Sequence, residues 1–418
     1  MAPRSGRELA LAALREWRTS ETFADAILAR KLRSSELIPP DRGFATELFY
    51  GVLRNLTLLD FWIARLRPQD LELAARDILR LGLYQLFVIE TPEHAAVFET
   101  VELAGARLRS LVNAVLRNAL RQKEVLLESA RREDLSTRRS HPQFLIERWT
   151  ENFGAENAAA LCEWNNLPAP IYARINLLKT SLEEFIIQYP EAEPLPGREN
   201  FVRLKSVPSE ALTAGHCYVQ DPSTALACRL LDPRPGERVL DACAAPGGKT
   251  AFLAELLQNR GEIVASDRDA SRIQTLQDNL ERLGVGVGRV AHHDWTSGQS
   301  LPEAWRTPLF DRILVDAPCS NTGVMRRRVD LRWRLTPRDF SRMPHEQLRI
   351  LRAIMPLLKI GGVLVYSTCS IEPEENERVV DAMLREFSFL KLVEQHSLLP
   401  FRDGFDGAYA ARIMRDSE

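Results

Sequence analysis

Apolar residues follow a helical spacing through the first third of the chain. They recur three or four positions apart at 44–56, and again at 78–86 and 112–120. Residues at this spacing lie on one face of a helix. Prolines stand between these stretches and separate them. The pattern predicts a compact domain of five to seven helices over residues 1–130, and no residue cluster in it is typical of a catalytic site.

The pattern is mixed over residues 131–220. A polar, basic stretch leads into a predicted helix at 144–153, and the segment IYARINLLKTS at 171–181 alternates between apolar and polar residues as a strand does. Prolines and a glycine near 190–197 indicate a loop. We interpret this region as a small α+β adaptor subdomain.

From residue 221 onward, short β-rich runs alternate with helical stretches. The predicted strands are 238–242, 262–266, 288–292, 312–316 and 363–367, and the predicted helices are 249–257, 270–283 and 345–358. This alternation is typical of a parallel, doubly wound sheet. Ligands of such sheets bind outside the carboxyl ends of the strands, so functional residues are expected there.

The composition is that of a globular protein without a membrane segment. Of the 418 residues, 45% are hydrophobic and 27% charged. No apolar run reaches the roughly 18 residues of a membrane span, and the first residues lack the apolar core of a signal peptide. Six cysteines without a CxxC pair favour neither a disulfide scaffold nor a structural zinc site. We expect a cytoplasmic protein with free thiols and no membrane or metal partner.

Arginine clusters are more informative than the net charge of −2. Arg326, Arg327 and Arg328 follow closely on Cys319, within a basic stretch that runs to residue 352. Such a run is usually a solvated face. Arginine also suits phosphate groups, so these three residues are candidates for contacts with nucleic acid.

The first predicted strand runs into the segment DACAAPGGKT, at 241–250. Small residues let the backbone approach a ligand, and the N–H groups at the start of the following helix suit a polar or anionic group. A GxGxxG fingerprint is absent. Asp267 ends the next strand, about 20 residues on, where an acid suits a ribose diol. The alternative for Asp267 and Asp269 is capping of the helix that follows.

The third predicted strand ends in HHDW. Asp294 is a candidate acceptor for an adenine amino group. Alternatively, His292, His293 and Asp294 would be metal ligands. Adjacent residues of a strand point to opposite faces, which disfavours a shared ion.

Two cysteines come directly after predicted strands, in VDAPCSNTG and YSTCS. Asp316 and Cys319 follow the fourth strand, and Cys369 follows the fifth. Neighbouring strands lie about 4.8 Å apart, so both thiols are expected to face one pocket. The alternatives are a disulfide, a metal site, or cysteines that are only small buried side chains of the core. Placement at strand ends disfavours the last of these.

This set of groups suits methyl transfer to a pyrimidine. A thiolate that adds to C6 makes C5 nucleophilic, and C5 then takes a methyl group from S-adenosylmethionine. One cysteine as nucleophile and a second that assists elimination fit this sequence of steps. Asp316 is a candidate for holding the N3/N4 edge of a cytosine, with a raised pKa if it donates to N3.

The motifs DACAAPGGKT, VDAPCSNTGVMRR and YSTCSIEPEENE resemble those of the RNA cytosine-5 methyltransferase family, the NOL1/NOP2/Sun group. The resemblance covers residues from about 140 to 418. RGFATELFYGVLRN, ILRLGLYQLF and HAAVFETVELA are similar to the NusB fold. The resemblance implies an all-α, NusB-like, RNA-binding domain at 1–130, a small α+β adaptor at 131–220 and an α/β, Rossmann-like class I methyltransferase domain at 221–418.

The resemblance also implies roles for individual residues. Cys369 would be the nucleophile, and Cys319 the thiol that helps release the product. The residues implied for S-adenosylmethionine are Cys243, Ala244, Ala245, Pro246, Gly247, Gly248, Lys249, Asp267, Asp294 and Asp316. The segment DGAYAARI near the C-terminus would form the last antiparallel strand, beside Cys369.

The implied activity is methylation of C5 of a cytosine in 16S ribosomal RNA, by a monomer. The NusB-like region favours ribosomal RNA by analogy. The alternatives are the same chemistry on tRNA, or a non-catalytic, NusB-like RNA-binding assembly factor. Intact copies of all three motifs argue against the last alternative.

Overall fold

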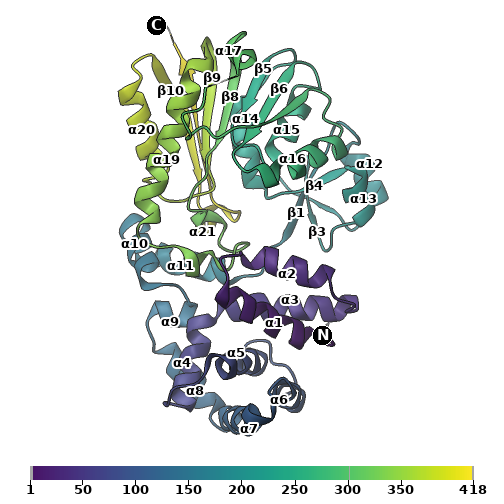
Figure 1. Cartoon of the computed structure of the whole chain (residues 1–418), viewed down its shortest axis with the longest axis vertical. Helices are drawn as coiled ribbons and strands as arrows, with labels where there is room; N and C mark the ends of the chain where they lie inside the picture. Colours follow the sequence, from purple (N-terminus) through teal and green to yellow (C-terminus); the bar gives the residue numbers. More distant parts are fainter. Residues whose placement is uncertain (1–2, 301, 417–418) are drawn as a thin grey trace. The chain divides into compact units, whose positions relative to one another are not determined.

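The computed structural model describes residues 3–300 and 302–416. These residues form two compact units (Figure 1). The helical unit comprises the chain up to residue 167 together with 325–335, and the sheet unit comprises 168–324 and the chain from 336 onward. The boundary between the two units therefore falls inside the predicted adaptor region, because its helices before residue 168 belong to the helical unit, whereas its strands and its later helices belong to the sheet unit.

Within residues 3–131, the part of this stretch that the structure describes, the helical unit contains eight helices, more than the five to seven predicted. They are α1 (Gly6–Thr19), α2 (Ala24–Arg33), α3 (Pro39–Arg54), α4 (Leu56–Leu66), α5 (Leu73–Phe87), α6 (Glu93–Glu102), α7 (Ala106–Arg121) and α8 (Lys123–Arg131). Asn55 ends α3 and precedes α4, and Gln122 stands likewise between α7 and α8. Single-residue breaks of this kind leave the apolar spacing almost unchanged, so the sequence pattern did not separate these helices.

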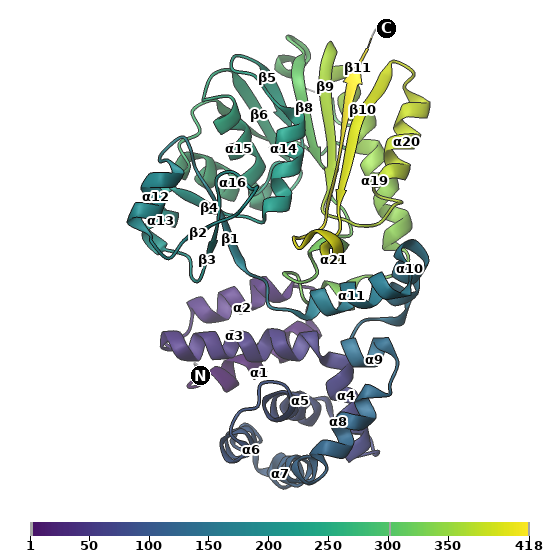
Figure 2. The ribbon, with the colours of Figure 1, turned by 180° about the vertical axis from the view of Figure 1, so that it is seen from behind.

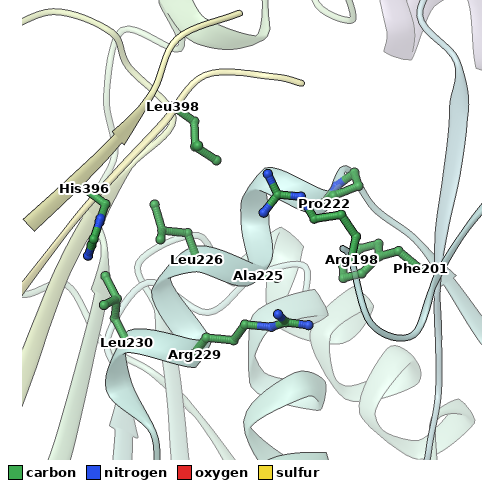
Figure 3. Close-up of a pocket in the computed structure, with 9 residues that line it drawn as sticks. All are labelled: Arg198, Phe201, Pro222, Ala225, Leu226, Arg229, Leu230, His396 and Leu398. Atoms are coloured by element: carbon green, nitrogen blue, oxygen red, sulfur yellow. The ribbon is translucent and has the colours of Figure 1, made fainter. Parts of the chain in front are cut away.

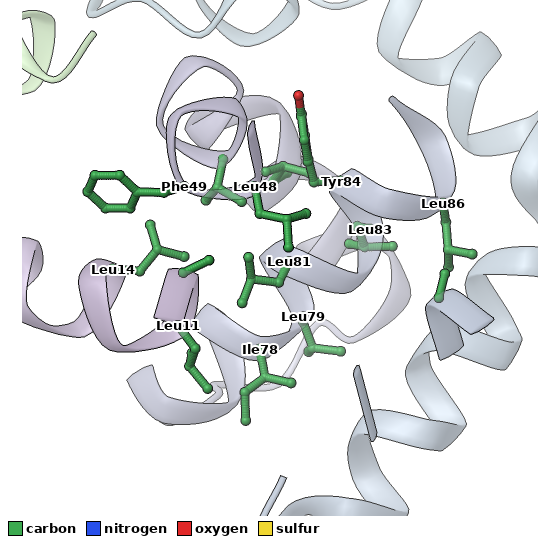
Figure 4. Packing of buried hydrophobic residues seen from close by; sticks show 14 of the residues in the cluster. Leu11, Leu14, Leu48, Phe49, Ile78, Leu79, Leu81, Leu83, Tyr84 and Leu86 are labelled. Carbon is green, nitrogen blue, oxygen red and sulfur yellow. The ribbon is translucent and has the colours of Figure 1, made fainter. Parts of the chain in front are cut away.

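Four further helices complete this unit: α9 (Leu135–Arg139), α10 (Gln143–Phe153), α11 (Ala155–Asn166) and α18 (Leu331–Arg334). Buried leucines from α1, α3 and α5 meet in the core, as Leu11, Leu48 and Leu81 illustrate (Figure 4). Val329 packs against the same cluster from the distant 325–335 segment.

The 325–335 segment is held in the helical unit by specific hydrogen bonds. The carboxylate of Asp330 accepts from the indole of Trp17 and from the backbone N–H of Ala24, each at 3.0 Å. Phe23, the N-cap residue of α2, has no side-chain acceptor, so Asp330 caps that helix from 306 positions away. Arg332 is fully buried and donates to Asn166 Oδ1 at 2.6 Å.

The sheet unit begins with a small antiparallel sheet of order β2-β3-β1-β4. Its elements are β1 (Ile171–Ile175), α12 (Leu182–Gln188), β2 (Glu193–Pro194), β3 (Phe201–Leu204), α13 (Ser209–Ala214) and β4 (Cys217–Val219). This agrees with the predicted mixture of helix and strand, including the strand in IYARINLLKTS.

A seven-stranded sheet of order β10-β11-β9-β8-β5-β6-β7 follows. The strands are β5 (Arg238–Asp241), β6 (Glu262–Asp267), β7 (Gly288–His292), β8 (Phe310–Asp316), β9 (Leu358–Thr368), β10 (Leu390–Leu398) and β11 (Ala408–Arg415). Strands β5 to β9 are parallel, whereas β11 is antiparallel to β9 and β10 to β11. The predicted parallel, doubly wound sheet is confirmed, as is the last antiparallel strand, in which Tyr409 pairs with Thr368.

Helices cover both faces of this sheet (Figures 1 and 2). The unit's helices are α14 (Ala225–Leu231), α15 (Gly248–Leu256), α16 (Ala270–Arg282), α17 (Glu303–Arg306), α19 (Asp339–Ile354), α20 (Glu377–Glu386) and α21 (Pro400–Asp403), with short 3₁₀ turns at η1 (Pro222–Thr224), η2 (Thr322–Val324) and η3 (Met355–Leu357). Residues of α14 and α15 pack with the strands in one apolar cluster, and those of α19 and α20 in another. No helix in the described part of the chain is both long and apolar enough to span a membrane.

Candidate active site

The two cysteines at the strand ends lie next to each other. The parallel pairing of β8 with β9 brings Asp316 opposite Ser367, and the chain continues from there to Cys319 and Cys369. Their sulfur atoms are 3.4 Å apart. A disulfide bond would be about 2.05 Å long, so these are two separate thiols in contact.

Three loops fix the position of Cys369. The N–H of Gly323 donates to the Cys369 carbonyl at 3.0 Å, and the N–H of Gly407 donates to the Gly323 carbonyl at 2.8 Å. A Cβ atom on Gly323 would stand 2.6 Å from the Cys369 carbonyl oxygen, so only glycine allows this approach. Asn321 Oδ1 accepts from the Cys369 thiol at 3.1 Å, which adds a side-chain contact from the loop of Cys319.

Glu375 connects the two cysteine loops through hydrogen bonds to the serine that follows each cysteine. Its fully buried carboxylate accepts from the Ser320 N–H and the Ser370 hydroxyl, each at 2.8 Å, and from the Gln347 amide at 3.1 Å. Burial raises the pKa of Glu375, although these hydrogen bonds oppose the shift. The sequence reasoning missed this residue, although Glu375 lies in the motif YSTCSIEPEENE, five positions after Ser370.

Cys319 holds its proton firmly. Its hydrogen bond with Cys369 and then its burial raise the pKa of Cys319 well above the ordinary value. Cys319 is 6% exposed, whereas Cys369 is half-buried and lines a pocket. The geometry therefore makes the two thiols unequal, with Cys369 the more accessible.

Lys249 and Asp316 lie in the same pocket as Cys369. The ammonium of Lys249 donates to Asp316 Oδ2 at 2.7 Å, and the Ser367 hydroxyl donates to Oδ1 at 3.0 Å. Burial alone would lower the pKa of Lys249, but the charge and hydrogen bond of Asp316 outweigh it and raise that pKa above its ordinary value. The pocket measures about 40 Å³ and also touches Leu226 and the 406–409 segment.

The turn between β5 and α15 needs its glycines. Gly247 has a φ of +104°, and a Cβ atom there would stand 2.8 Å from Leu276. A Cβ atom on Gly248 would stand 2.5 Å from the ring of Tyr218. Cys243, Ala244, Ala245 and Pro246 form the rest of the turn ahead of α15, as the sequence predicted.

Asp267 supports this turn from the end of β6. Its Oδ2 accepts from the N–H of Ala245 at 3.1 Å, and its Oδ1 accepts from the N–H of Asp269 at 3.0 Å. Asp269 caps α16, because its side chain accepts from the N–H of Ser271 at 2.9 Å. The capping role considered for both acids therefore belongs to Asp269.

Asp241 is a second residue that sequence reasoning missed. It is fully buried at the end of β5, and its Oδ2 accepts from the Thr250 hydroxyl at 2.7 Å. Its Oδ1 has no hydrogen-bond partner among the described residues. Burial raises the pKa of Asp241 to about 7. The signal was present, since Asp241 is the first residue of DACAAPGGKT.

Asp294 and the neighbouring histidines are held by local contacts. Asp294 Oδ1 accepts from the Thr296 N–H at 2.8 Å and from its hydroxyl at 2.7 Å; burial acts to raise the pKa of Asp294, but these bonds hold it below the ordinary value. His292 contacts the Arg268 carbonyl at 2.9 Å, and His293 packs edge-on against Trp295. No group of three or more His, Cys, Asp or Glu side chains in the described ranges is arranged to hold a metal ion.

The three candidate arginines belong to the helical unit. Arg326 is 3% exposed, and its guanidinium lies 3.8 Å from the centre of the Trp164 ring. A contact of Arg326 with RNA phosphates would therefore require this side chain to leave Trp164. Arg327 is half-buried and Arg328 is exposed.

Five parallel strands with an antiparallel pair at one edge, and acids at the ends of β5, β6 and β8, define a class I methyltransferase. Comparison with known families agrees. Residues 228–413 match the family described as 16S rRNA methyltransferase RsmB/F, residues 4–121 match the NusB family, and residues 141–193 match the ferredoxin-like domain of RsmF/B-like methyltransferases.

Curated relatives match along nearly the whole chain. The chain is 36% identical to a probable ribosomal RNA small subunit methyltransferase B of Bacillus subtilis, over 92% of this chain and 89% of the relative. It is also 36% identical to the ribosomal RNA small subunit methyltransferase B of Proteus mirabilis, over 93% and 96%. The chain belongs to the family of ribosomal RNA small subunit methyltransferase B.

Solved structures support the fold. The crystal structure of PH0851 has a TM-score of 0.80 and 25% identity over 99% of both chains. A methyltransferase homologue from Pyrococcus horikoshii has a TM-score of 0.59 and 30% identity, over 68% of this chain and 98% of its own. The predicted fold class and the predicted S-adenosylmethionine-dependent rRNA methyltransferase are thereby confirmed.

Proposed function

We propose that the chain methylates C5 of a cytosine in 16S ribosomal RNA through a covalent bond between Cys369 and C6 of the base. The observation that carries this proposal is the 3.4 Å contact between the Cys369 and Cys319 sulfurs, beside a pocket that also holds Lys249 and Asp316. The six free cysteines suit a reducing compartment, which favours the cytoplasm.

The residues fit S-adenosylmethionine at the β5–α15 turn. The buried, unpartnered Oδ1 of Asp241 is an acceptor for a cationic group. The carboxylate of Asp267 retains lone pairs beyond its two backbone hydrogen bonds, which suits a ribose diol, and Asp294 is the proposed partner of the adenine amino group. When bound, the cofactor supplies the methyl group from its sulfonium.

Cys369 and Cys319 divide the covalent chemistry between them. The Cys369 thiolate would form a bond to C6, which makes C5 nucleophilic toward the methyl group that the bound cofactor would supply. Transfer of the C5 proton to water as the base would then restore the C5–C6 double bond and break the bond between the Cys369 sulfur and C6. The raised pKa of Cys319 keeps it as a thiol, so it is placed to donate a hydrogen bond to the departing Cys369 thiolate.

Lys249 and Asp316 are proposed to hold the target base. Both line the pocket of Cys369, which favours the base over the methionine end of the cofactor as the partner of Lys249. The Lys249 ammonium is a donor for N3 or O2 of cytosine, and the Asp316 carboxylate accepts from the exocyclic amino group. Arg327 and Arg328 keep their proposed role as contacts for RNA phosphates.

Two cysteine variants test the covalent route. Cys369→Ala should abolish methylation of 16S rRNA while the protein still binds the cofactor, as measured by calorimetry. Cys319→Ala should accumulate an RNA adduct, visible as a shifted band on a denaturing gel. Methylation by Cys369→Ala near the wild-type rate would refute the assignment of the nucleophile.

Bisulfite sequencing of RNA from a deletion strain tests the substrate. A cytosine that loses its methyl group in 16S rRNA supports the proposal, whereas a loss confined to tRNA would favour the alternative substrate. If no cytosine changes and the purified protein methylates neither RNA, the non-catalytic assembly role stands instead.

A further inference from the structure

A second cavity lies in the sheet unit beside the pocket of Cys369. It measures about 220 Å³ and opens between α14, the loop before β3 and the end of β10 (Figure 3). Its lining residues are Arg198, Phe201, Pro222, Ala225, Leu226, Arg229, Leu230, His396 and Leu398. None of these residues belongs to the cofactor or cysteine motifs.

The cavity combines an apolar floor with a cationic rim. Leu226, Leu230 and Leu398 provide apolar surface, and the guanidinium groups of Arg198 and Arg229 reach the opening from the loop and from α14 (Figure 3). Arg198 lies over the Phe405 ring at 4.9 Å and has no ion pair among the described residues.

The remaining polar groups at the rim leave the arginines available. Arg229 is paired with Glu199 at 3.7 Å, but the Glu199 side chain is 85% exposed and gives a weak, solvated pair. His396 contacts Glu394 at 3.0 Å. Arg229 also donates to the Glu199 carbonyl at 3.3 Å, and an anionic ligand can displace the exposed Glu199 carboxylate at little cost.

One turn of chain separates this cavity from the pocket of Cys369. Leu226 lines both, and the η1 turn and the start of α14 contribute residues to each. The turn is braced, because Asp221 accepts from the N–H of Ser223 at 2.9 Å. An RNA strand that delivers a cytosine to Cys369 would bring the adjoining nucleotide to this cavity.

We propose that the cavity is an RNA subsite for the nucleotide next to the target cytosine. Its base would pack against Leu226, Leu230 and Leu398, and its phosphate would contact Arg198 and Arg229. Sequence-specific RNA recognition uses splayed, unstacked bases, and arginine suits the phosphates beside them. The cavity is smaller than the roughly 300 Å³ of sites for drug-sized ligands, which suits one base. This subsite rests on the proposed function, since it presupposes RNA at Cys369.

The charged rim is tested with the double variant Arg198→Gln/Arg229→Gln. The matched control, Arg234→Gln/Arg260→Gln, removes two exposed arginines near the amino ends of β5 and β6. The probe is 16S rRNA from a strain that lacks the enzyme. We expect KM for this RNA to rise about tenfold in the rim variant and to stay at the wild-type value in the control.

Salt dependence separates a phosphate contact from a loss of fold. The slope of log affinity against log salt should fall by about 0.7 in the rim variant if one phosphate contact is lost. Leu398→Trp, which fills the cavity without changing charge, should raise KM and leave the slope unchanged. Rim and filling variants that bind RNA as tightly as the control would overturn the subsite.

The two proposals fail in different ways. RNA affinity is measured by filter binding, independently of methyl transfer. A wild-type protein that forms no methylcytosine refutes the proposed function. A wild-type protein that methylates, with rim variants indistinguishable from the control in KM and salt slope, refutes the subsite alone.

Discussion

A buried ion pair connects the small antiparallel sheet to the cofactor turn. The side chains of Arg174, on β1, and Glu255, on α15, are 1% and 3% exposed. Arg174 also donates to Gln220 Oε1 at 3.0 Å and to the Gly248 carbonyl at 3.1 Å, and it lies 4.5 Å from the centre of the Phe252 ring. One side chain thus holds the first residue of α15 in place.

Arg174→Met should strongly destabilise the sheet unit. Methionine fills much of the same volume but leaves the Glu255 carboxylate buried without its partner. Removing one member of a buried pair costs about 3–5 kcal/mol, against about 5–15 kcal/mol for the stability of a typical domain. The double variant Arg174→Met/Glu255→Leu leaves no buried charge, so it should lose only about 1–3 kcal/mol, for the unpaired Gly248 carbonyl.

The loss of folding stability in Arg174→Met should depend on pH, and its direction follows from the pKa of Glu255. Burial raises the pKa of Glu255, and Arg174 opposes that shift. Without Arg174 the pKa of Glu255 in the folded protein rises further above its unfolded value. A carboxyl of this kind binds its proton more tightly when folded, so stability falls as pH rises through that window. The loss of folding stability in Arg174→Met, relative to the wild type, should be smallest near pH 4 and should grow toward neutral pH.

Urea titration followed by hydrogen-exchange mass spectrometry of peptides from β5 and α15 reports on the sheet unit alone. Arg352→Met is the control, because its pair with Glu386 is exposed, at 49% and 38%, and should contribute little to stability. The reasoning is refuted if Arg174→Met costs no more than this control, or if the double variant is less stable than the single one.

Three further outcomes are expected. Glu375→Ala removes the acceptor shared by the two cysteine loops, so it should lower kcat at least tenfold and leave the affinity for the cofactor unchanged. Methyl-transfer rates measure kcat and calorimetry measures the affinity; an unchanged kcat would contradict the prediction. Gly323→Ala places a Cβ atom 2.6 Å from the Cys369 carbonyl oxygen, so methylation should slow although cofactor still binds; a wild-type rate would show that the approach is not required. In the wild type, the raised pKa of Asp241 should lower the free energy of unfolding by about 1.4 kcal/mol for each unit by which the pH rises between about pH 4 and pH 7. Asp241→Asn removes this carboxyl and should flatten that dependence. Calorimetric unfolding across the range measures the slope.

The sequence predicted the strand ends well because their signals are local. An apolar run followed at once by an acid, a small residue or a cysteine marks the carboxyl end of a parallel strand. Asp267, Asp316 and the two cysteines were found in this way. The five predicted parallel strands agree with the structure to within a few residues at most ends.

The missed features depend on contacts between distant residues. Glu375 acts through Ser320, 55 positions away, and Arg174 reaches Glu255 across 81 positions. Asp330 caps α2 although nothing in either local sequence marks the pairing. Arg326 was interpreted from its charge and its place close after Cys319, and its stacking on Trp164 is decided by packing that a basic run does not reveal.

The 325–335 segment has a consequence for how the chain is made. A ribosome completes all residues up to Val324 before it makes the segment that supplies Asp330 and Val329 to the helical unit. From residue 167 to residue 335, synthesis takes roughly 10–30 s at about 5–20 residues per second. During that interval α2 lacks its cap and the first core lacks a side chain. The unit synthesised first is therefore completed only after most of the sheet unit has emerged, which couples the maturation of the two.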